Sequence, residues 1–410
     1  MAAARPFVAR GGPRSWVSAL PSTASLNLLE LAQQRRQGYA DAPGMSVVRT
    51  ASGGLPGGLG QTTAGESASS APLGARGEVD GAVRPDETYA AVDLGTNNCR
   101  LLIARPAGDG FRVVDSYSRI VRLGAGVAET GALSQAAMDR TIAALSVCAQ
   151  KMRRHGVTRQ RHVATEACRR ARNGREFLRR VEQETGLRLD MIPPEEEARL
   201  ALSGCTPLLD SASEYTLVFD IGGGSTELIW TRLVAGEEPR MLAWTSLPCG
   251  VVTLAEAHGG REPDMAAYER MVADVQDRLV AFESKEQLRS HFEEAGARMV
   301  GISGTVTTLA AVLADLPRYD RSAVDGAFVS TTDLLSVSRE LASMTYAERV
   351  AHPCIRRGRA DLVLPGCAAL EAILRTWPSG GVRVADRGLR EGILRSLMGT
   401  QAVVGAAPAR

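Results

Sequence analysis

The sequence has little aromatic content, no long apolar run and no excess of charge of one sign. Aromatic residues make up 4% of the 410 positions, too few for the base-stacking surfaces of single-strand nucleic-acid binders. No stretch stays apolar for the ~18 residues that a membrane-spanning helix needs. The 48 basic residues nearly balance the 46 acidic ones, which disfavours a nucleic-acid coat protein or an acidic tail. The sequence therefore predicts that neither nucleic acid nor a membrane is the partner.

The cysteine and histidine patterns disfavour common structural sites. The seven cysteines are odd in number, widely spaced and include no Cys-x-x-Cys motif. This pattern disfavours a disulfide framework or a zinc site and favours a reducing compartment. The five histidines show no ligand spacing. We therefore expect a cytoplasmic protein whose cysteines are buried small hydrophobic residues.

The first 87 residues differ from the rest in composition. Segments such as 53–58 and 66–72 consist mainly of glycine, serine, alanine and proline, without apolar periodicity. Such segments cannot bury enough apolar surface to offset the entropy lost on ordering. We expect residues 1–87 to form a disordered, dispensable extension.

Beyond this extension, one pattern occurs twice: a short strand ending in an aspartate, a glycine-rich turn and a second strand. The first copy contains Asp93 and the second contains Asp220. An internal duplication with its two copies this far apart in the chain, at Asp93 and Asp220, predicts two similar α/β domains that face each other across a cleft. We expect one domain over residues 88–210 and the other over residues 211–400.

Other elements of the first domain follow from periodicity and capping signals. Apolar residues at helical spacing predict a helix over 134–155, with Ser134 as its N-cap. A strand is expected over 187–192. A further helix opens at Glu195 after Pro193–Pro194, with acidic residues in its first turn.

The second turn, residues 222–225, has residue types that suit both an anion and a cation. Three consecutive glycines let the main chain turn sharply and approach a ligand closely, and we expect a positive φ at Gly223. Their N–H groups can form a concave anion site. Asp220 and Glu227 at the edges suit Mg²⁺, or a water held against a phosphate. A plain hairpin needs none of these carboxylates, so the pattern indicates a phosphate site.

Four further segments are weaker signals. The first turn, 93–98, repeats the aspartate–glycine pattern. A third turn, 301–305, precedes a helix expected to begin near Val306, and a helix N-terminus attracts anions. The acidic run 195–197 is either helix N-terminal charge or part of a site. The basic cluster 169–175 is either a solvated loop or a phosphate contact.

Jointly, these motifs resemble those of the exopolyphosphatase / guanosine pentaphosphate phosphohydrolase (Ppx/GppA) family, short two-domain form. The resemblance covers about residues 88–400 and rests on segments 93–100, 121–123, 196–199, 220–227, 301–305 and 386–392. It implies two similar actin-like α/β domains of the acetate kinase and sugar kinase superfamily, which are ribonuclease H-like, with a cleft between them. Two departures stand out: Pro193–Pro194 replaces a Ser-Gly pair before the Glu helix, and Ala125 replaces an acidic residue.

The resemblance implies a role for each matching residue. Glu197 is the general base that activates water, and Glu227 orients that water or a Mg²⁺ ion. The implied metal ligands are Asp93, Asp220 and Glu227. The implied phosphate-binding residues are Gly95, Thr96, Asn97, Arg100, Gly222, Gly223, Gly224, Ser225, Thr226, Gly304 and Thr305. Such a set suits phosphoryl transfer, which depends on positioning and charge neutralisation.

The implied activity is stepwise release of orthophosphate from the end of inorganic polyphosphate. The alternatives are hydrolysis of guanosine pentaphosphate by the same machinery, a sugar or acyl kinase, and a non-catalytic nucleotide-binding module. The kinase is disfavoured because we find no adenine site in the sequence. The module is disfavoured because a binder gains nothing from the uncompensated carboxylates of Glu197 and Glu227 near phosphate. The resemblance also allows a homodimer.

Overall fold

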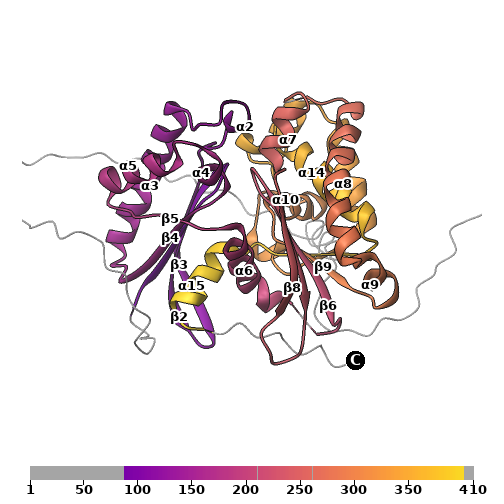
Figure 1. The fold of residues 1–410 in the computed structure, drawn as a ribbon, viewed down its shortest axis with the longest axis horizontal. Coiled ribbons are helices and arrows are strands. Elements are labelled where there is room, and N and C mark those ends of the chain that lie inside the picture. The colour runs from indigo at the N-terminus through magenta and orange to yellow at the C-terminus, as the bar shows by residue number, and fades with distance from the viewer. Residues whose placement is uncertain (1–86, 210, 261, 401–410) are drawn as a thin grey trace, which may run out of the picture.

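The computed structural model describes residues 87–209, 211–260 and 262–400. The predicted disordered extension over 1–87 lies outside these residues, apart from Glu87. The described chain forms two mixed α/β units, each built around its own sheet (Figure 1). Among the described helices, none combines the length and the apolar character that a membrane crossing requires.

The first sheet has five strands in the order β3-β2-β1-β4-β5. They are β1 (Tyr89–Leu94), β2 (Asn98–Ala107), β3 (Gly110–Ile120), β4 (Arg159–Ala164) and β5 (Asp190–Met191). Strands β1, β2 and β3 are antiparallel neighbours, whereas β4 runs parallel to β1 and β5 parallel to β4. The strand predicted over 187–192 is therefore much shorter, because only two of its residues pair with β4.

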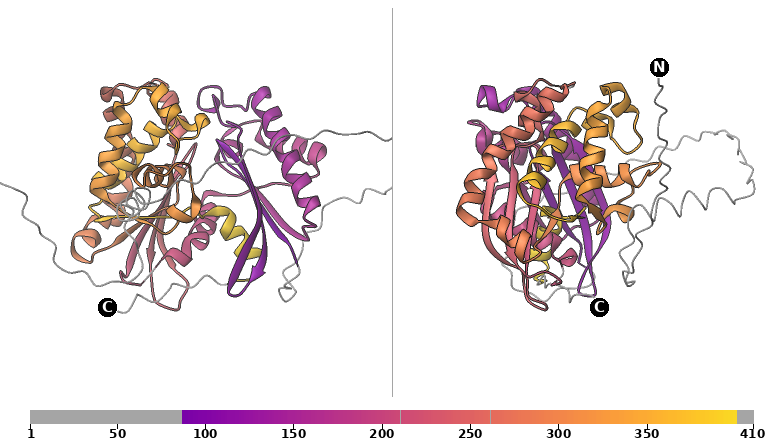
Figure 2. Two further views of the ribbon diagram at one scale, coloured as in Figure 1. Left: turned by 180° about the vertical axis from the view of Figure 1, so that it is seen from behind. Right: turned by 90° about the vertical axis from the view of Figure 1, so that its right-hand side faces the viewer.

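Helices α3 (Gln135–Arg154) and α5 (Gly174–Thr185) cover the outer face of this sheet (Figures 1 and 2). The short helices α2 (Val127–Thr130) and α4 (Glu166–Arg170) lie toward the upper end of the unit in Figure 1. The predicted N-cap of α3 is confirmed, because Ser134 Oγ accepts a hydrogen bond from Ala137 N at 3.3 Å. Buried Leu145 and Phe177 belong to the core between these helices and the sheet.

The second sheet repeats the plan of the first and has the strand order β10-β11-β9-β6-β7-β8. Its strands are β6 (Tyr215–Ile221), β7 (Thr226–Arg232), β8 (Arg240–Leu247), β9 (Arg298–Gly301), β10 (Phe328–Ser330) and β11 (Gly381–Val384). Strands β6, β7 and β8 are antiparallel neighbours, and β9 runs parallel to β6. Because β1 to β4 have the same arrangement, the predicted pair of similar α/β domains is confirmed.

The outer layer of the second unit consists of helices that enclose the larger hydrophobic core. They are α7 (Val251–Ala257), α8 (Met265–Glu286), α9 (Leu288–Glu294), α10 (Gly304–Leu313), α11 (Arg321–Val324), α12 (Thr331–Ser343), α13 (Tyr346–Ala351) and α14 (Val363–Thr376). The helix predicted to begin near Val306 begins at Gly304 instead.

Two further helices, α6 (Pro194–Cys205) and α15 (Leu389–Leu397), lie between the sheets (Figure 1). The buried side of α6 packs on the second sheet, whereas α15 packs on the first. Each helix thus covers the sheet built from the other half of the chain. The domain limits at residues 88–210 and 211–400 stay a prediction, since these two helices interlock the units.

Glycines allow α6 and α15 to pack against each other closely. A Cβ on Gly204 would lie 1.9 Å from the carbonyl oxygen of Gly388, and a Cβ on Gly392 would lie 1.9 Å from that of Leu200. Both distances are far below van der Waals contact. The approach of the two main chains therefore requires glycine on each helix.

We expect Gly392→Ala to destabilise the protein by forcing α6 and α15 apart. Overpacking of this kind costs about 1–3 kcal/mol. Thermal unfolding of the full chain would measure the loss. Gly380→Ala is the matched control, because no heavy atom lies within 4 Å of a Cβ at Gly380. Equal melting temperatures for the two variants would show that the helix crossing is not tightly packed.

Candidate active site

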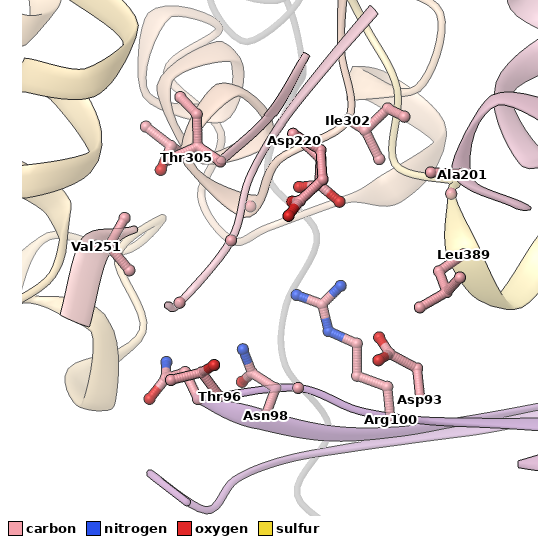
Figure 3. Close-up of a pocket in the computed structure, with 18 of the residues that line it drawn as sticks. Asp93, Thr96, Asn98, Arg100, Ala201, Asp220, Val251, Ile302, Thr305 and Leu389 are labelled. Atoms are coloured by element: carbon pink, nitrogen blue, oxygen red, sulfur yellow. The ribbon is translucent and has the colours of Figure 1, made fainter. Parts of the chain in front are cut away.

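A pocket of about 1310 Å³, part of it open to solvent, lies between the two units (Figure 3). Its walls come from the ends of β1 and β6, from the turns that follow them, and from the N-terminal ends of α6, α10 and α15. Carboxylates, glycine turns and arginine side chains from both units line it. The pocket therefore presents groups of both signs of charge to a ligand.

Nearly all the predicted site residues meet in this pocket. They are Asp93, Gly95, Thr96, Asn97, Arg100, Glu197, Asp220, Gly222, Gly223, Gly224, Ser225, Glu227, Gly304 and Thr305. Thr226 is the exception, because its buried hydroxyl donates a hydrogen bond to the Cys249 carbonyl oxygen at 2.7 Å. Side chains alternate between the two faces of a strand. Since Glu227 of β7 faces the pocket, the side chain of Thr226 faces away from it. The predicted contact between the Thr226 side chain and phosphate is therefore wrong.

The second turn is built from glycine for a different reason than the sequence suggests. None of Gly222, Gly223 and Gly224 has a positive φ, so the positive φ expected at Gly223 is wrong. A Cβ on Gly223 would instead lie 3.0 Å from Thr96 Cβ and 3.1 Å from Asn97 N. Gly223 and Gly224 are required because the first turn approaches across the cleft, whereas a Cβ on Gly222 would lie 2.9 Å from the Ser225 carbonyl oxygen of its own turn.

The first turn is fixed by main-chain hydrogen bonds from the segment that follows β3. The Asn97 carbonyl oxygen accepts from Val121 N at 2.9 Å and from Arg122 N at 3.1 Å, and the Thr96 carbonyl oxygen accepts from Gly124 N at 2.9 Å. The buried Oδ1 of Asn97 has no partner within the described residues. This turn therefore presents a fixed polar group next to the pocket.

The third turn opens α10 and brings a residue that sequence reasoning missed. Ser303 caps the helix by accepting from Thr305 N at 3.2 Å. A Cβ on Gly304 would lie 2.7 Å from Nη1 of Arg359, which also lines the pocket. Burial, then the positive charges of Arg100 and Arg356, lower the pKa of Arg359 to about 10. An anion beside Arg359 would relieve this repulsion. The signal in the sequence for this residue is the arginine-rich segment 356–359.

Glu197 reaches the pocket from the first turn of α6. Pro193 is the N-cap and Pro194 the first helical residue, so the double proline starts the helix rather than displacing it. Glu197 Oε2 accepts a hydrogen bond from Arg169 Nη1 at 2.8 Å. Burial raises the pKa of Glu197 to about 7, against the lowering effect of Arg169.

Arg169 is held in place by two further contacts. Its Nη1 donates to the Ile192 carbonyl oxygen at 2.9 Å, and its Nη2 donates to Glu166 Oε2 at 3.0 Å. The basic cluster 169–175 therefore does not present this arginine to phosphate. Arg169 instead fixes one oxygen of Glu197.

Glu227 lies in the pocket wall with one oxygen bound by two hydroxyls. Its Oε1 accepts from Ser225 Oγ at 2.6 Å and from Ser246 Oγ at 2.9 Å. Burial, and then the negative charges of Glu197 and Asp220, raise the pKa of Glu227 well above its usual range. Ser246 on β8 belongs to none of the sequence motifs, so only the register of β7 with β8 reveals it.

Asp93 and Asp220 face each other across the pocket, with the side chain of Arg100 between them (Figure 3). Burial raises the pKa of both carboxyls, to about 6 for Asp220, and Arg100 opposes the rise. No cluster of three or more candidate ligands converges on one point within the described ranges. Mg²⁺ commonly takes only one or two carboxylates and completes its shell with phosphate and water, and this pair of aspartates fits such a cation.

Paired glycine turns over buried carboxylates, carried by two actin-like α/β domains, define a class of enzymes that act on phosphate groups. Within that class the chain belongs to the Ppx/GppA phosphatase family, whose model matches residues 102–401. It is 34% identical over 324 residues to Exopolyphosphatase 2 of Mycobacterium tuberculosis, and the match covers 76% of this chain and 98% of that protein.

Solved structures show the same fold. The Aquifex aeolicus member of the Ppx/GppA family is 30% identical with a TM-score of 0.62, and the match covers 76% of this chain and 97% of that one. An exopolyphosphatase from Cytophaga hutchinsonii is 23% identical with a TM-score of 0.67, and the match covers 77% of this chain and all of that one, 100%. The expected actin-like fold and membership of this phosphatase family are confirmed.

Gly223→Val is expected to weaken substrate binding by pushing the first turn away from the second. A misplacement of about 1 Å at such a site can reduce the rate about 10²-fold. We would measure kcat and KM for phosphate release together with the melting temperature. Gly110→Val is the control, because a Cβ at Gly110 meets nothing within 4 Å. A folded Gly223→Val enzyme with unchanged kinetics would show that this turn has only a structural role.

Proposed function

We propose that this protein is an exopolyphosphatase, which hydrolyses the terminal phosphoanhydride bond of inorganic polyphosphate and releases orthophosphate. The observation that carries the proposal is Glu197, a half-buried carboxyl with a pKa raised to about 7 that lines a pocket formed by glycine-rich turns. A general base works best when its pKa lies near the working pH. The 34% identity to an exopolyphosphatase supports polyphosphate as the substrate.

Main-chain and guanidinium groups of both units bind the terminal phosphates. Gly223 and Gly224 supply the main chain of the second turn, and Gly304 supplies the N-terminal end of α10. Arg100 and Arg359 approach from opposite units, and guanidinium groups pair well with phosphate oxygens. The substrate thus replaces the repulsion between these two arginines with attraction.

Glu197 removes a proton from a water molecule, whose oxygen attacks the terminal phosphorus. The bond from that phosphorus to the bridging oxygen breaks, and the shortened chain leaves with the electron pair on this oxygen. The terminal group departs as orthophosphate, and Glu197 returns its proton to solvent. Arg169 holds Oε2 of Glu197, which leaves the other oxygen for the water, and Glu227 orients that water.

The residues of the pocket fit a divalent cation such as Mg²⁺. Asp93 and Asp220 are half-buried carboxyls with raised pKa values, and a bound cation would favour their charged forms. Glu227 lies beside them. When bound, Mg²⁺ supplies positive charge that neutralises the phosphate oxygens as the bond breaks.

Glu197→Gln keeps the size of the side chain but cannot accept the proton of the water. Loss of a general base reduces the rate by about 10²–10⁴, so kcat should fall by that factor. Substrate binding should persist or tighten, because a negative charge next to polyanionic phosphate is removed. Phosphate release from polyphosphate, guanosine pentaphosphate and ATP, assayed in parallel, would measure the effect and identify the substrate.

Glu196→Gln is the matched control on the same helical turn. Glu196 pairs with Arg161 and does not line the pocket, so this variant should retain nearly full activity. Full activity of Glu197→Gln would move the base to Glu227. Faster turnover of guanosine pentaphosphate than of polyphosphate would replace the proposed substrate.

A further inference from the structure

The segment 121–126, between β3 and α2, connects the two units beside the first phosphate turn. Arg122 Nη2 lies 2.8 Å from Asp361 Oδ2 and donates to the Gly358 carbonyl oxygen at 3.3 Å. Gly126 N donates to Glu256 Oε1 at 2.9 Å. Figure 1 shows α2, which follows this segment, next to α7. Two polar bridges therefore span the cleft within five residues of chain.

On the side of the first unit, this segment is attached to the first phosphate turn. Val121 N and Arg122 N both donate to the Asn97 carbonyl oxygen, and Gly124 N donates to that of Thr96. A Cβ on Gly124 would lie 2.3 Å from Thr96 Cγ2. The segment and the turn are packed so closely that they move as one piece.

On the side of the second unit, both bridges end on elements that form the other phosphate turns. Asp361 is two residues from Arg359, which contacts Gly304 of the third turn. Glu256 belongs to α7, and the first N–H groups of that helix donate to Gly222 and Gly223 carbonyl oxygens at 2.9 and 2.8 Å. Each bridge thus links the first turn to one of the other two.

The main chain of Arg122 is in the left-handed region, with φ of 49°. Residues other than glycine seldom adopt this conformation, and it persists where the surroundings fix it. The main chain here binds the first turn while the side chain extends toward the second unit. Arg122 does not line the pocket, so any influence on the reaction passes through other residues.

We propose that residues 121–126 form a latch, with Arg122 as its positioning residue, that holds the phosphate ligands of the two units at their closed spacing. Asp361 and Glu256 are the sites on the second unit to which the latch attaches. The effect on catalysis rests on the proposed function, whereas the effect on the spacing of the units does not. Because the latch contributes only to the closed arrangement, its loss shifts the population toward open molecules.

Arg122→Met and Asp361→Asn each remove one charge of the main bridge and keep the side-chain size similar. We expect each variant to raise KM for polyphosphate about 2- to 5-fold, as for a partly exposed ion pair, with a smaller change in kcat. The KM of the double variant should be no higher than that of the more impaired single variant, because both changes break the same interaction. Arg278→Met is the matched control: its 39% exposed side chain resembles that of Arg122 at 40%, but it pairs with Asp274 within α8.

Amide hydrogen exchange of the full chain without substrate provides a readout independent of activity. Arg122→Met should accelerate exchange both in 121–126 and across the cleft in 356–362, and leave α3 and α8 unchanged. Unchanged exchange across the cleft, or unchanged KM in an active enzyme, would overturn the latch. If the wild-type protein releases no phosphate from any substrate, the proposed function fails, and the exchange comparison still decides the latch.

Discussion

The burial of four carboxyl groups in one pocket is the constraint on which the rest of the site depends. Glu227 is buried, whereas Asp93, Asp220 and Glu197 are half-buried in the pocket wall; partial or full burial raises the pKa of each. Each negative charge also makes the others harder to ionise. Arginines and serine hydroxyls offset part of this cost in the free protein. A bound cation would neutralise the carboxyl groups, and the phosphates of a polyanionic substrate would neutralise the arginines, because the pocket holds both signs of charge on fixed elements.

The fold keeps these groups together by packing that has little freedom. The duplicated strand and turn place Asp93 and Asp220 opposite each other, and the crossing of α6 with α15 at Leu200 and Gly204 fixes the helix that carries Glu197. Arg169 comes from a different helix, after β4, and its contacts to Ile192 and Glu166 leave it one orientation. The site is therefore assembled at the junction of elements from both halves of the chain, and the latch over 121–126 acts on that same junction.

Local signals in the sequence predicted most of the scaffold and the turns. Strand β6, the N-cap Ser134 and the duplicated aspartate turns are confirmed because they depend on residues close together in the chain. What sequence reasoning missed depends on contacts between distant residues: Arg359 beside Gly304, and Ser246 beside Glu227.

The errors have the same origin. Gly223 was expected to have a positive φ, yet its φ is not positive and its missing side chain makes room for Thr96 of the other unit. Thr226 was assigned to the phosphate site by its place in a motif, but the alternation of β7 turns its hydroxyl to Cys249. The role of Arg169 could not be derived from a cluster of arginines, because its partner Glu197 is 28 positions away.

The pH dependence of kcat for polyphosphate, compared between the wild-type enzyme and Arg169→Met, tests the central claim most directly. Glu197 accepts a proton only when it is ionised, so kcat should fall as the pH drops below about 7. Arg169 lowers the pKa of Glu197; its removal should therefore move the midpoint to higher pH, and Arg169→Lys should move it back. Titration of the substrate is common to all three enzymes and cannot produce this shift. A midpoint that is the same in all three, or a kcat that does not depend on pH, would contradict the assignment of Glu197 as the base.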